Sequence, residues 1–570
     1  TITDICPVQK THDGNLVTGY DMNWVSELMV KFDILGLRTL SVIYDVCKTI
    51  GEDISKMNLN DPKIFKPLQS LKTPHGLFQL ESDTNFKVCK KIKPKSLEQL
   101  SAVVAIGRPG ALDFLDAYVK YSETEEPQVI HEFFRDVLDY TGGIPLYQEQ
   151  LMQMAVKVGF TLDESEQLRR IVGKKKVDQM PAWKAKIQQK IIENDLPTEV
   201  GEVLWRVAED SANYSFNKSH SLAYATLAAW TAYLKFNYPQ EFFMSLLKMT
   251  KYEPAPQEEI ASISRELSNF GIKLLSPDLA KSKMDFSTEG KDIRFGLNSV
   301  KGVSEKSLQS LRDFRSSETP TKYDIFLAAK QAGLNIGILS ALCQAGALQS
   351  KGPNRSLMAL EAQAFNLLTD REKRNFILLG EKYDHKLLNC IADAKSQELV
   401  GDDGKPLMKE SRFKTFKKKY DLYKSIYDKN KSYEKFANWY FENELLGYSH
   451  SSKLKNCFKD VFKDLKDSRD LELMDKDDGG KFIGVVDDCL KATSRNGNKY
   501  IKLSMSDENG KWDAMLLNSR RGNFYDRYFE KNEKAPAKKN IVIAYGRKAE
   551  DIIFLDSIKI MDEKIYMKMS

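Results

Sequence analysis

An acidic residue inside an apolar run is the first feature of this sequence that could do chemistry. Asp33 lies in the segment Lys31–Leu40 (KFDILGLRTL), where apolar residues follow it up to Gly36. A carboxylate at the edge of a buried strand is costly unless it meets a metal ion or a cation. Lys31 shares a strand face with Asp33, because the two are two residues apart. A structural ion pair and a metal ligand are both open at this point.

A basic cluster further along could bind a polyphosphate. Five positive charges fall within eight residues, at Arg169, Arg170, Lys174, Lys175 and Lys176. Arginine makes forked contacts to phosphate oxygens, whereas lysine acts as a point charge. The cluster suits a nucleoside triphosphate, and a solvated basic helix face is the alternative.

The segment Asn217-Lys218-Ser219-His220 reads as a loop that leads into a helix over 221–236. Ser219 or Ser221 could cap that helix, and a helix N-terminus beside a lysine favours an anion. The alternative is a cap alone, with His220 in the core. Arg108 is the other basic residue expected near a substrate.

Six segments, in the same order, resemble the C-family bacterial-type replicative DNA polymerases, the DNA polymerase III alpha subunit. They are KFDILGLRTL (31–40), GLFQLES (76–82), IGRPG (106–110), PLYQEQLM (145–152), LRRIVGKKK (168–176) and YSFNKSHSLAY (214–224). The resemblance implies the C-terminal part of such an enzyme: the end of the palm, the fingers, a helix-hairpin-helix module and an oligonucleotide-binding (OB) barrel.

The resemblance also implies roles for these residues. Asp33 would be the last of three aspartates that bind two Mg²⁺ ions, and Lys31 would contact phosphate. The other two aspartates are expected outside this chain, in a separate palm-bearing chain or in a longer protein, so that residues 1–570 alone would be inactive. The nucleotide-binding residues implied are Arg108, Arg169, Arg170, Lys174, Lys175, Asn217, Lys218, Ser219 and His220.

Residues 295–304 (FGLNSVKGVS) resemble a helix-hairpin-helix turn, which binds DNA phosphate without reading sequence. The expected contacts are Lys301, Gly302, Val303 and Ser304, although Ser304 stands where a second glycine is usual. Ala345-Gly346-Ala347 resembles the partner hairpin. A purely structural helical hairpin is the alternative.

The end of the chain predicts a five-stranded barrel. Ile501, Leu503 and Met505 alternate with polar residues, and Asn496-Gly497 and Asn509-Gly510 indicate tight hairpins. Such a barrel binds single strands through basic and aromatic side chains. The candidates are Arg495, Lys499, Tyr500 and Lys502, while Trp512 is either a stacking platform or part of the core.

The expected fold class is a multidomain α+β protein, mainly helical, with a small β palm remnant at its start. The predicted domains are the palm remnant (1–37), fingers (38–250), helix-hairpin-helix module (251–350), Lys-rich helical linker (351–477) and OB-fold domain (478–570). Within the linker, Phe413, Phe416, Tyr420, Tyr423 and Tyr427 recur every three or four residues, which predicts a helix with one aromatic face. A packed helix and a DNA- or partner-facing helix are both open.

Composition is compatible with several functions. At 570 residues and a net charge of +6, charge alone does not establish nucleic-acid binding. Seven scattered cysteines and the lack of a long apolar run favour a reducing cytoplasm. The partners expected are primer–template DNA, dNTPs and the palm-bearing chain, with a sliding clamp considered because Gln309–Phe314 loosely fits its peptide. A non-catalytic DNA-binding scaffold of a replisome and a generic single-strand or RNA-binding protein are the rival functions.

Overall fold

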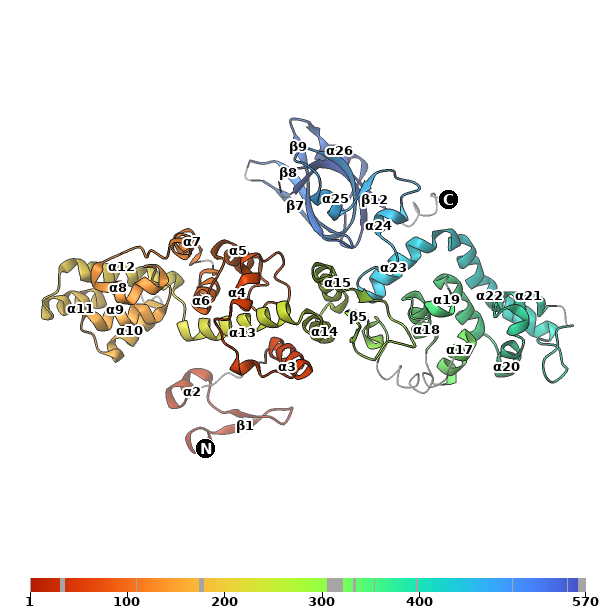
Figure 1. Ribbon diagram of the computed structural model, residues 1–570, viewed down its shortest axis with the longest axis horizontal. Coiled ribbons are helices and arrows are strands. Elements are labelled where there is room, and N and C mark those ends of the chain that lie inside the picture. The colour runs from red at the N-terminus through yellow and green to blue at the C-terminus, as the bar shows by residue number, and fades with distance from the viewer. Residues whose placement is uncertain are drawn as a thin grey trace.

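The computed structural model describes most of the chain. The described residues are 2–30, 36–108, 110–173, 179–304, 321–331, 335–352, 354–395, 398–494, 496–550 and 552–561. Figure 1 shows a helical arm at one end, a second helical arm at the other, and a β-barrel above the region where the two arms meet.

The N-terminal segment forms a hairpin flanked by short helices. Its elements are α1 (Ile2–Ile5), β1 (Val8–Lys10), β2 (Leu16–Thr18) and α2 (Met22–Leu28). β1 and β2 are antiparallel, and Asp21 caps α2 by accepting from the N–H groups of Asn23 and Trp24. The strand predicted around Asp33 lies outside the described residues.

The first arm is helical, as the sequence predicts. Its helices are α3 (Arg38–Ile50), α4 (Pro62–Gln69), α5 (Asp83–Ile92), α6 (Leu97–Ile106), α7 (Leu115–Thr124), α8 (Arg135–Leu138), α9 (Gln148–Val158), α10 (Leu162–Gly173), α11 (Met180–Glu193), α12 (Thr198–Tyr214), α13 (Lys218–Asn237) and α14 (Pro239–Met249). One apolar core joins α4, α5, α6 and α13, and a second joins α8 to α12.

Helix α13 connects the cores of this part of the molecule. Its alanines Ala225, Ala228, Ala229 and Ala232 are buried against α4 and α6. Small side chains at these positions allow neighbouring helices to approach closely. Near its C-terminal end, Leu234 joins a third core with α3 and α14.

That third core extends through the second arm. The elements here are α15 (Pro256–Leu267), β3 (Leu274–Leu275), β4 (Ser287–Glu289), β5 (Asp292–Arg294), α17 (Lys322–Gln331), α18 (Ile336–Gln344), α19 (Arg355–Asn366), α20 (Asp370–Leu378), α21 (Leu387–Asp393), α22 (Glu410–Asn430) and α23 (Glu434–Leu446). Phe416 and Tyr420 of α22 are buried in this core, so part of the predicted aromatic face packs against the other helices of the second arm. Tyr423 of the same face is 38% exposed.

The C-terminal strands close into a barrel. The strands are β7 (Gly479–Thr493), β8 (Lys499–Ser506), β9 (Lys511–Ser519), β11 (Ile541–Lys548) and β12 (Ile552–Met561), and α26 (Phe524–Lys531) connects β9 to β11. Pairing runs β7–β8–β9–β12–β11 and back to β7, with β9 and β12 parallel. Around it lie α24 (Leu454–Cys457), β6 (Leu465–Lys466), α25 (Ser468–Glu472) and β10 (Gly522–Asn523).

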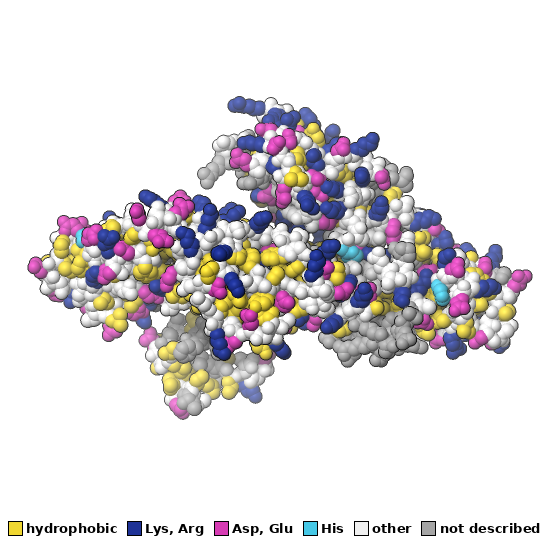
Figure 2. Space-filling view, in the orientation of Figure 1, with side chains coloured by type: hydrophobic (Ala, Val, Ile, Leu, Met, Phe, Trp, Pro, Cys, Tyr) yellow, Lys and Arg dark blue, Asp and Glu magenta, His cyan; other side chains and the backbone are white. Residues whose placement is uncertain are grey.

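The α+β multidomain fold class is therefore confirmed. Positive and negative side chains are interspersed over the face shown in Figure 2, in line with the small net charge. Within the described part of the chain, no helix is both long and apolar enough to cross a membrane.

A buried lysine in the second arm gives a first prediction. The Lys373 side chain is fully buried; its amino nitrogen lies 3.7 Å from the exposed carboxylate of Asp370 but has no hydrogen-bond partner among the described residues. Burial and the nearby charge of Lys330 lower the pKa of Lys373 to about 8. Because the folded state disfavours the charged form, we expect Lys373→Met to raise the free energy of unfolding at pH 7 by about 1–2 kcal/mol.

The sign of the pH dependence tests this interpretation. The penalty for burying the charge is present below pH 8 and disappears as the pH rises toward the ordinary lysine pKa near 10.5. The advantage of Lys373→Met in thermal unfolding should shrink over that range. Lys414→Met, at an exposed ion pair with Glu410, is the matched control and should change little. An advantage of Lys373→Met that is equal at pH 7 and pH 10 would contradict the prediction.

Candidate nucleotide-binding site

A polar cavity lies where three of the segments singled out by sequence, 76–82, 106–110 and 214–224, come together. Its volume is about 370 Å³. The loop before α5, the end of α6 and the start of α13 form its walls. The lining residues are Gln79, Ser82, Thr84, Asn85, Val104, Gly107, Arg108, Phe216, His220 and Tyr224.

Arg108 is the free cation of this cavity. Its guanidinium carbon lies 4.1 Å from the centre of the Phe216 ring. This cation–π contact helps to fix the position of the side chain. Within the described part of the chain, Arg108 has no ion pair or side-chain hydrogen bond, so its donors are available to a phosphate.

The cavity depends on one close backbone approach. Asn85 is buried and donates from Nδ2 to the carbonyl of Gln79 at 2.7 Å. A Cβ atom at Gly107 would lie 1.6 Å from Oδ1 of Asn85. Only glycine therefore fits beside Arg108 at this place.

The start of α13 differs from the sequence-based expectation. The helix begins at Lys218 and its cap is Asn217, which accepts from the His220 N–H at 2.8 Å. Neither Ser219 nor Ser221 is the cap, because Asn217 already has the side chain and backbone position for it. Ser219 is exposed in the first turn, and buried Ser221 donates to the Ser101 carbonyl.

His220 is an exposed aromatic wall of the cavity and not a core residue. Its ring centre lies 4.1 Å from that of Tyr224 and 5.6 Å from that of Phe216, with the Phe216 pair stacked. Together with Arg108 over the Phe216 ring, these rings provide a surface on which a planar group could stack.

A carboxylate already occupies the N-terminus of α13. Glu149 accepts from Nδ2 of Asn217 at 2.8 Å and from the Lys218 N–H at 2.9 Å. The Lys218 ammonium lies 4.2 Å from the centre of the Tyr140 ring. The helix terminus therefore binds an internal anion, and an external phosphate there would have to displace Glu149.

Arg169 and Arg170 are paired with Glu166. Arg169 makes a forked contact to both oxygens of Glu166, at 2.6 Å each, and Arg170 donates to Oε1 at 2.8 Å. The hydrogen bond from Arg169, opposed by burial, lowers the pKa of Glu166 to about 2. Arg169 also donates to Oε1 of Gln148 at 3.0 Å.

These contacts join the predicted residues into one network. The Gln148 N–H donates to the Phe216 carbonyl at 2.9 Å, so the segment beginning α9 connects Arg169 to the start of α13. Hydrogen bonds, ion pairs and the Phe216 cation–π contact thus link six of the predicted residues: Arg108, Arg169, Arg170, Asn217, Lys218 and His220. Lys174 and Lys175 lie outside the described residues.

Sequence reasoning missed the acidic partners. Glu166 is three and four residues before the two arginines, a spacing that predicts pairing on a helix. Glu149 carried no comparable signal, because its partners Asn217 and Lys218 are distant in sequence. Asn85 and Tyr224 were likewise not assigned to the site.

The described residues do not form a complete metal site. Among them, no group of three or more His, Cys, Asp and Glu side chains could hold a metal ion. Lys31 and the implied ligand Asp33 lie outside these residues. The described residues therefore supply no geometry for a metal-dependent step.

The helix-hairpin-helix turn follows η7 (Leu297–Ser299). Gly302 has φ +83°, with open space beside it, as a tight turn requires. The Lys301 N–H donates to the Leu445 carbonyl at 2.9 Å, and its ammonium lies 3.2 Å from Glu444.

The other predicted residues of the turn differ in exposure. Val303 is buried and its N–H donates to the Val300 carbonyl, whereas Ser304 is exposed. Ala345 and Ala347 of the second hairpin are buried.

On the barrel, Tyr500 and Lys502 lie on the outward face of β8, whereas Lys499 begins the strand on the face that becomes buried from Ile501 onward. Lys499 is exposed and Tyr500 is half-buried. Lys502 pairs with Asp513 at 2.8 Å. Trp512 is buried in the barrel core, which settles the choice left open by the sequence. Arg495 lies outside the described residues.

Two family models match this chain. The bacterial DNA polymerase III alpha subunit finger domain matches residues 39–195, and the helix-hairpin-helix motif matches residues 271–358. The first match contains Arg108, Gln148, Glu149, Arg169 and Arg170, and the second contains the turn at Gly302.

Curated relatives extend the similarity. The DNA polymerase III subunit alpha of Thermus aquaticus is 36% identical over 374 residues, covering 63% of this chain and 30% of that protein. That of Aquifex aeolicus is 37% identical over 379 residues, covering 64% and 32%. That of Halalkalibacterium halodurans is 28% identical over 527 residues, covering 90% and 44%. The chain thus spans between 30% and 44% of the length of these relatives.

The matches confirm that this chain resembles a C-family replicative DNA polymerase. The similarity is to one part of the DNA polymerase III alpha subunit, which includes its finger domain and a helix-hairpin-helix region.

Proposed function

We propose that this chain supplies the nucleotide- and DNA-binding part of a template-directed replicative DNA polymerase. The reaction is transfer of a nucleotidyl group from a dNTP to a primer 3′-OH, assisted by two Mg²⁺ ions. In this proposal Asp33 binds metal and Lys31 contacts phosphate. The other two metal-binding aspartates come from a palm segment outside residues 1–570.

The observation that carries the proposal is the unpaired Arg108 beside the polar cavity. Phe216, His220 and Tyr224 give that cavity an aromatic wall, and Arg108 gives it a phosphate donor. A triphosphate could also replace Glu166 on the forked guanidinium of Arg169, because phosphate and carboxylate oxygens accept in the same geometry.

The proposal predicts that Arg108→Ala weakens dNTP binding by about 10- to 100-fold, because one charge-assisted contact contributes about 1.5–3 kcal/mol. Titration with a fluorescent dNTP and labelling with a photoreactive dNTP measure this directly. Arg206→Ala is the matched control, since Arg206 is also exposed and has no ion pair among the described residues. Equal dNTP affinity in the Arg108→Ala protein and the unaltered chain would exclude Arg108 from the site.

A second prediction concerns catalysis. In an enzyme reconstituted from this chain and a polymerase segment that carries the other two aspartates, Asp33→Asn should abolish primer extension, because the metal site loses a ligand. DNA binding by gel shift should be unchanged. Normal extension by the variant would refute the metal role. A reconstituted complex that still binds DNA, but binds dNTP poorly and never extends a primer, would favour the scaffold function instead.

A further inference from the structure

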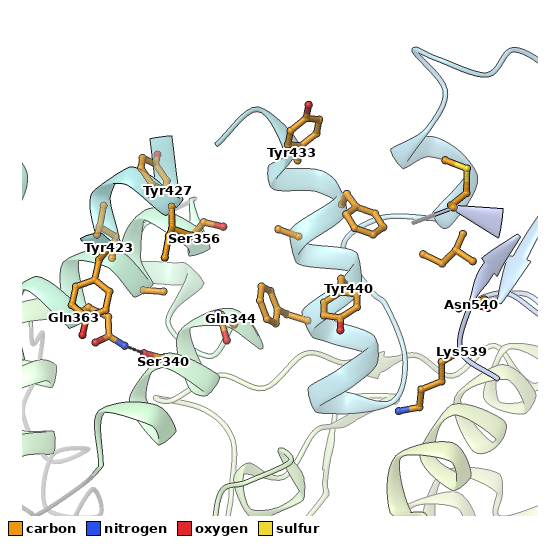
Figure 3. Close-up of a pocket in the computed structure, with 18 residues that line it drawn as sticks. Ser340, Gln344, Ser356, Gln363, Tyr423, Tyr427, Tyr433, Tyr440, Lys539 and Asn540 are labelled. Carbon is orange, nitrogen blue, oxygen red and sulfur yellow. Dashed lines mark hydrogen bonds between the residues drawn. The ribbon is translucent and has the colours of Figure 1, made fainter. Parts of the chain in front are cut away.

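A second cavity lies between the second arm and the barrel. Its volume is about 790 Å³, and it is lined by residues of α18, α19, α22 and α23 and by η11 (Lys431–Tyr433). On the barrel side it is lined by residues 539–541 at the start of β11 and by Met561, which pairs with Ile541 at the end of β12. Figure 3 shows Tyr423 and Tyr427 on α22, Tyr433 and Tyr440 near and on α23, and Lys539 and Asn540 on the barrel side. None of these residues belongs to the nucleotide site.

The lining of this cavity carries little charge. Among the described residues that line this cavity, none is acidic, although Asp and Glu number 80 in the sequence. The lining includes one cation, Lys539, and the amides of Gln344, Gln363 and Asn540. A surface without carboxylates accepts a polyanion at lower electrostatic cost.

Aromatic side chains dominate the walls and remain accessible. Tyr423 is 38% exposed and Tyr440 is 46% exposed, so both rings present a face to an incoming group. The Tyr433 hydroxyl is shielded from water and has no hydrogen-bond partner among the described residues. Accessible aromatic rings beside cations are the elements with which proteins bind single-stranded nucleic acid, because every base can stack.

Basic residues continue the same surface. Lys419 is four residues before Tyr423 and eight before Tyr427, so it lies on the same face of α22. Lys419 is exposed and has no ion pair among the described residues. At the barrel end, Lys539 pairs with Glu444 at 3.2 Å, a half-exposed contact for which a phosphate could compete.

We infer that this tyrosine cavity binds a segment of single-stranded nucleic acid, with bases stacked on Tyr423 and Tyr440 and phosphates near Lys419 and Lys539. The cavity reaches Ile541 and Met561 of the barrel, so a bound strand would pass from the second arm onto the barrel surface. The inference rests on the proposed function only for the choice of DNA as the probe.

Binding of a fluorescein-labelled oligo(dT) of about 20 nucleotides to the full chain tests it by anisotropy. Tyr423→Ala and Tyr440→Ala should each weaken binding by about tenfold, the effect of losing one stacked base. Tyr423→Phe should restore it, because the ring is kept. Tyr252→Ala, at a tyrosine that is 59% exposed outside the cavity, is the matched control and should bind normally.

Two further readouts separate a contact from a folding defect. Lys419→Ala should reduce the slope of log affinity against log salt by about 0.7. Photocross-linking of an iododeoxyuridine oligonucleotide should label peptides within 410–446. Circular dichroism of each variant should match the unaltered chain, since the substituted side chains are partly exposed.

The outcomes distinguish this inference from the proposed function. Wild-type affinity in both tyrosine variants, with weaker binding in Tyr500→Ala, would overturn the cavity as a strand site and leave the barrel as the binding surface. If the cavity instead binds an apolar peptide, the tyrosine variants should bind the oligonucleotide with unchanged affinity. That result would also overturn the cavity as a strand site. Loss of dNTP binding in Arg108→Ala is independent of either result.

Discussion

Glu442→Gln is expected to lower the free energy of unfolding of the second arm by about 3–5 kcal/mol, the cost of leaving one charge of a buried pair without its partner. Glu442 of α23 is fully buried and pairs with Arg355 of α19, which is 2% exposed. It also accepts from the Ser449 hydroxyl and from the backbone N–H groups of His450 and Ser451. Glutamine would leave the Arg355 guanidinium buried with neutral partners alone.

Acid titration provides a second readout for the same residue. Burial opposes ionisation, but the hydrogen bonds and charges of His450, Arg355 and Ser449 outweigh it and lower the pKa of Glu442 to about 2. The stabilisation is therefore present above the ordinary glutamate pKa near 4.5 and is lost as the pH falls toward 2. In Glu442→Gln this part of the acid dependence should be missing.

Calorimetry of the thermal transition measures the effect of Glu442→Gln. Asp421→Asn is the matched control, because Asp421 forms an exposed pair with Lys417 on α22, and it should change stability by less than about 0.5 kcal/mol. Equal transition temperatures for the two variants would show that the buried pair contributes no more than a surface pair.

Lys235→Met should destabilise the first arm by a similar amount, about 3–5 kcal/mol. Lys235 of α13 is fully buried, pairs with Glu266 of α15, and donates to the carbonyl of His75 at 2.6 Å. Burial, opposed by the charge of Glu266, lowers the pKa of Lys235. Methionine would fill the space but leave the Glu266 carboxylate buried and unpaired.

A double variant distinguishes charge from packing. Lys235→Met/Glu266→Met removes both charges, so it should recover most of the lost stability, measured by chemical denaturation. Lys91→Met, at an exposed pair with Asp116, controls for loss of a surface lysine. If the double variant is no more stable than Lys235→Met, the loss of stability would come from the His75 carbonyl, which loses its hydrogen-bond donor.

Local sequence patterns predicted the elements with repeated spacing. Period-two alternation in β8 placed Ile501, Leu503 and Met505 inside the barrel, and the spacing of Phe416 and Tyr420 placed them on one buried helix face. These predictions hold because they depend on neighbours within one element. The cap of α13 was misplaced, since Asn217, Ser219 and Ser221 are all of residue types that cap helices and lie within five residues.

The candidate site was predictable in its cations and not in their partners. Arg108, Arg169 and Lys218 stood out by residue type, but the pairing of Lys218 and Asn217 with Glu149 joins positions almost 70 residues apart. The tyrosine cavity had even less signal, because it combines α18, α22, α23 and the barrel. Such long-range arrangements depend on how elements pack, which no local spacing specifies.

The parallel pairing of β9 with β12 determines when the barrel can close during synthesis of the chain. Asp513 to Leu516 pair with Ile552 to Leu555, so the last seam of the barrel joins segments separated by α26 and β11. During synthesis the barrel cannot close until β12 has left the ribosome. Pairing between strands that are distant in sequence forms more slowly than pairing between adjacent strands. The nascent β7–β8–β9 meander therefore exposes the edge of β9, which is open to wrong pairing, until β12 is made.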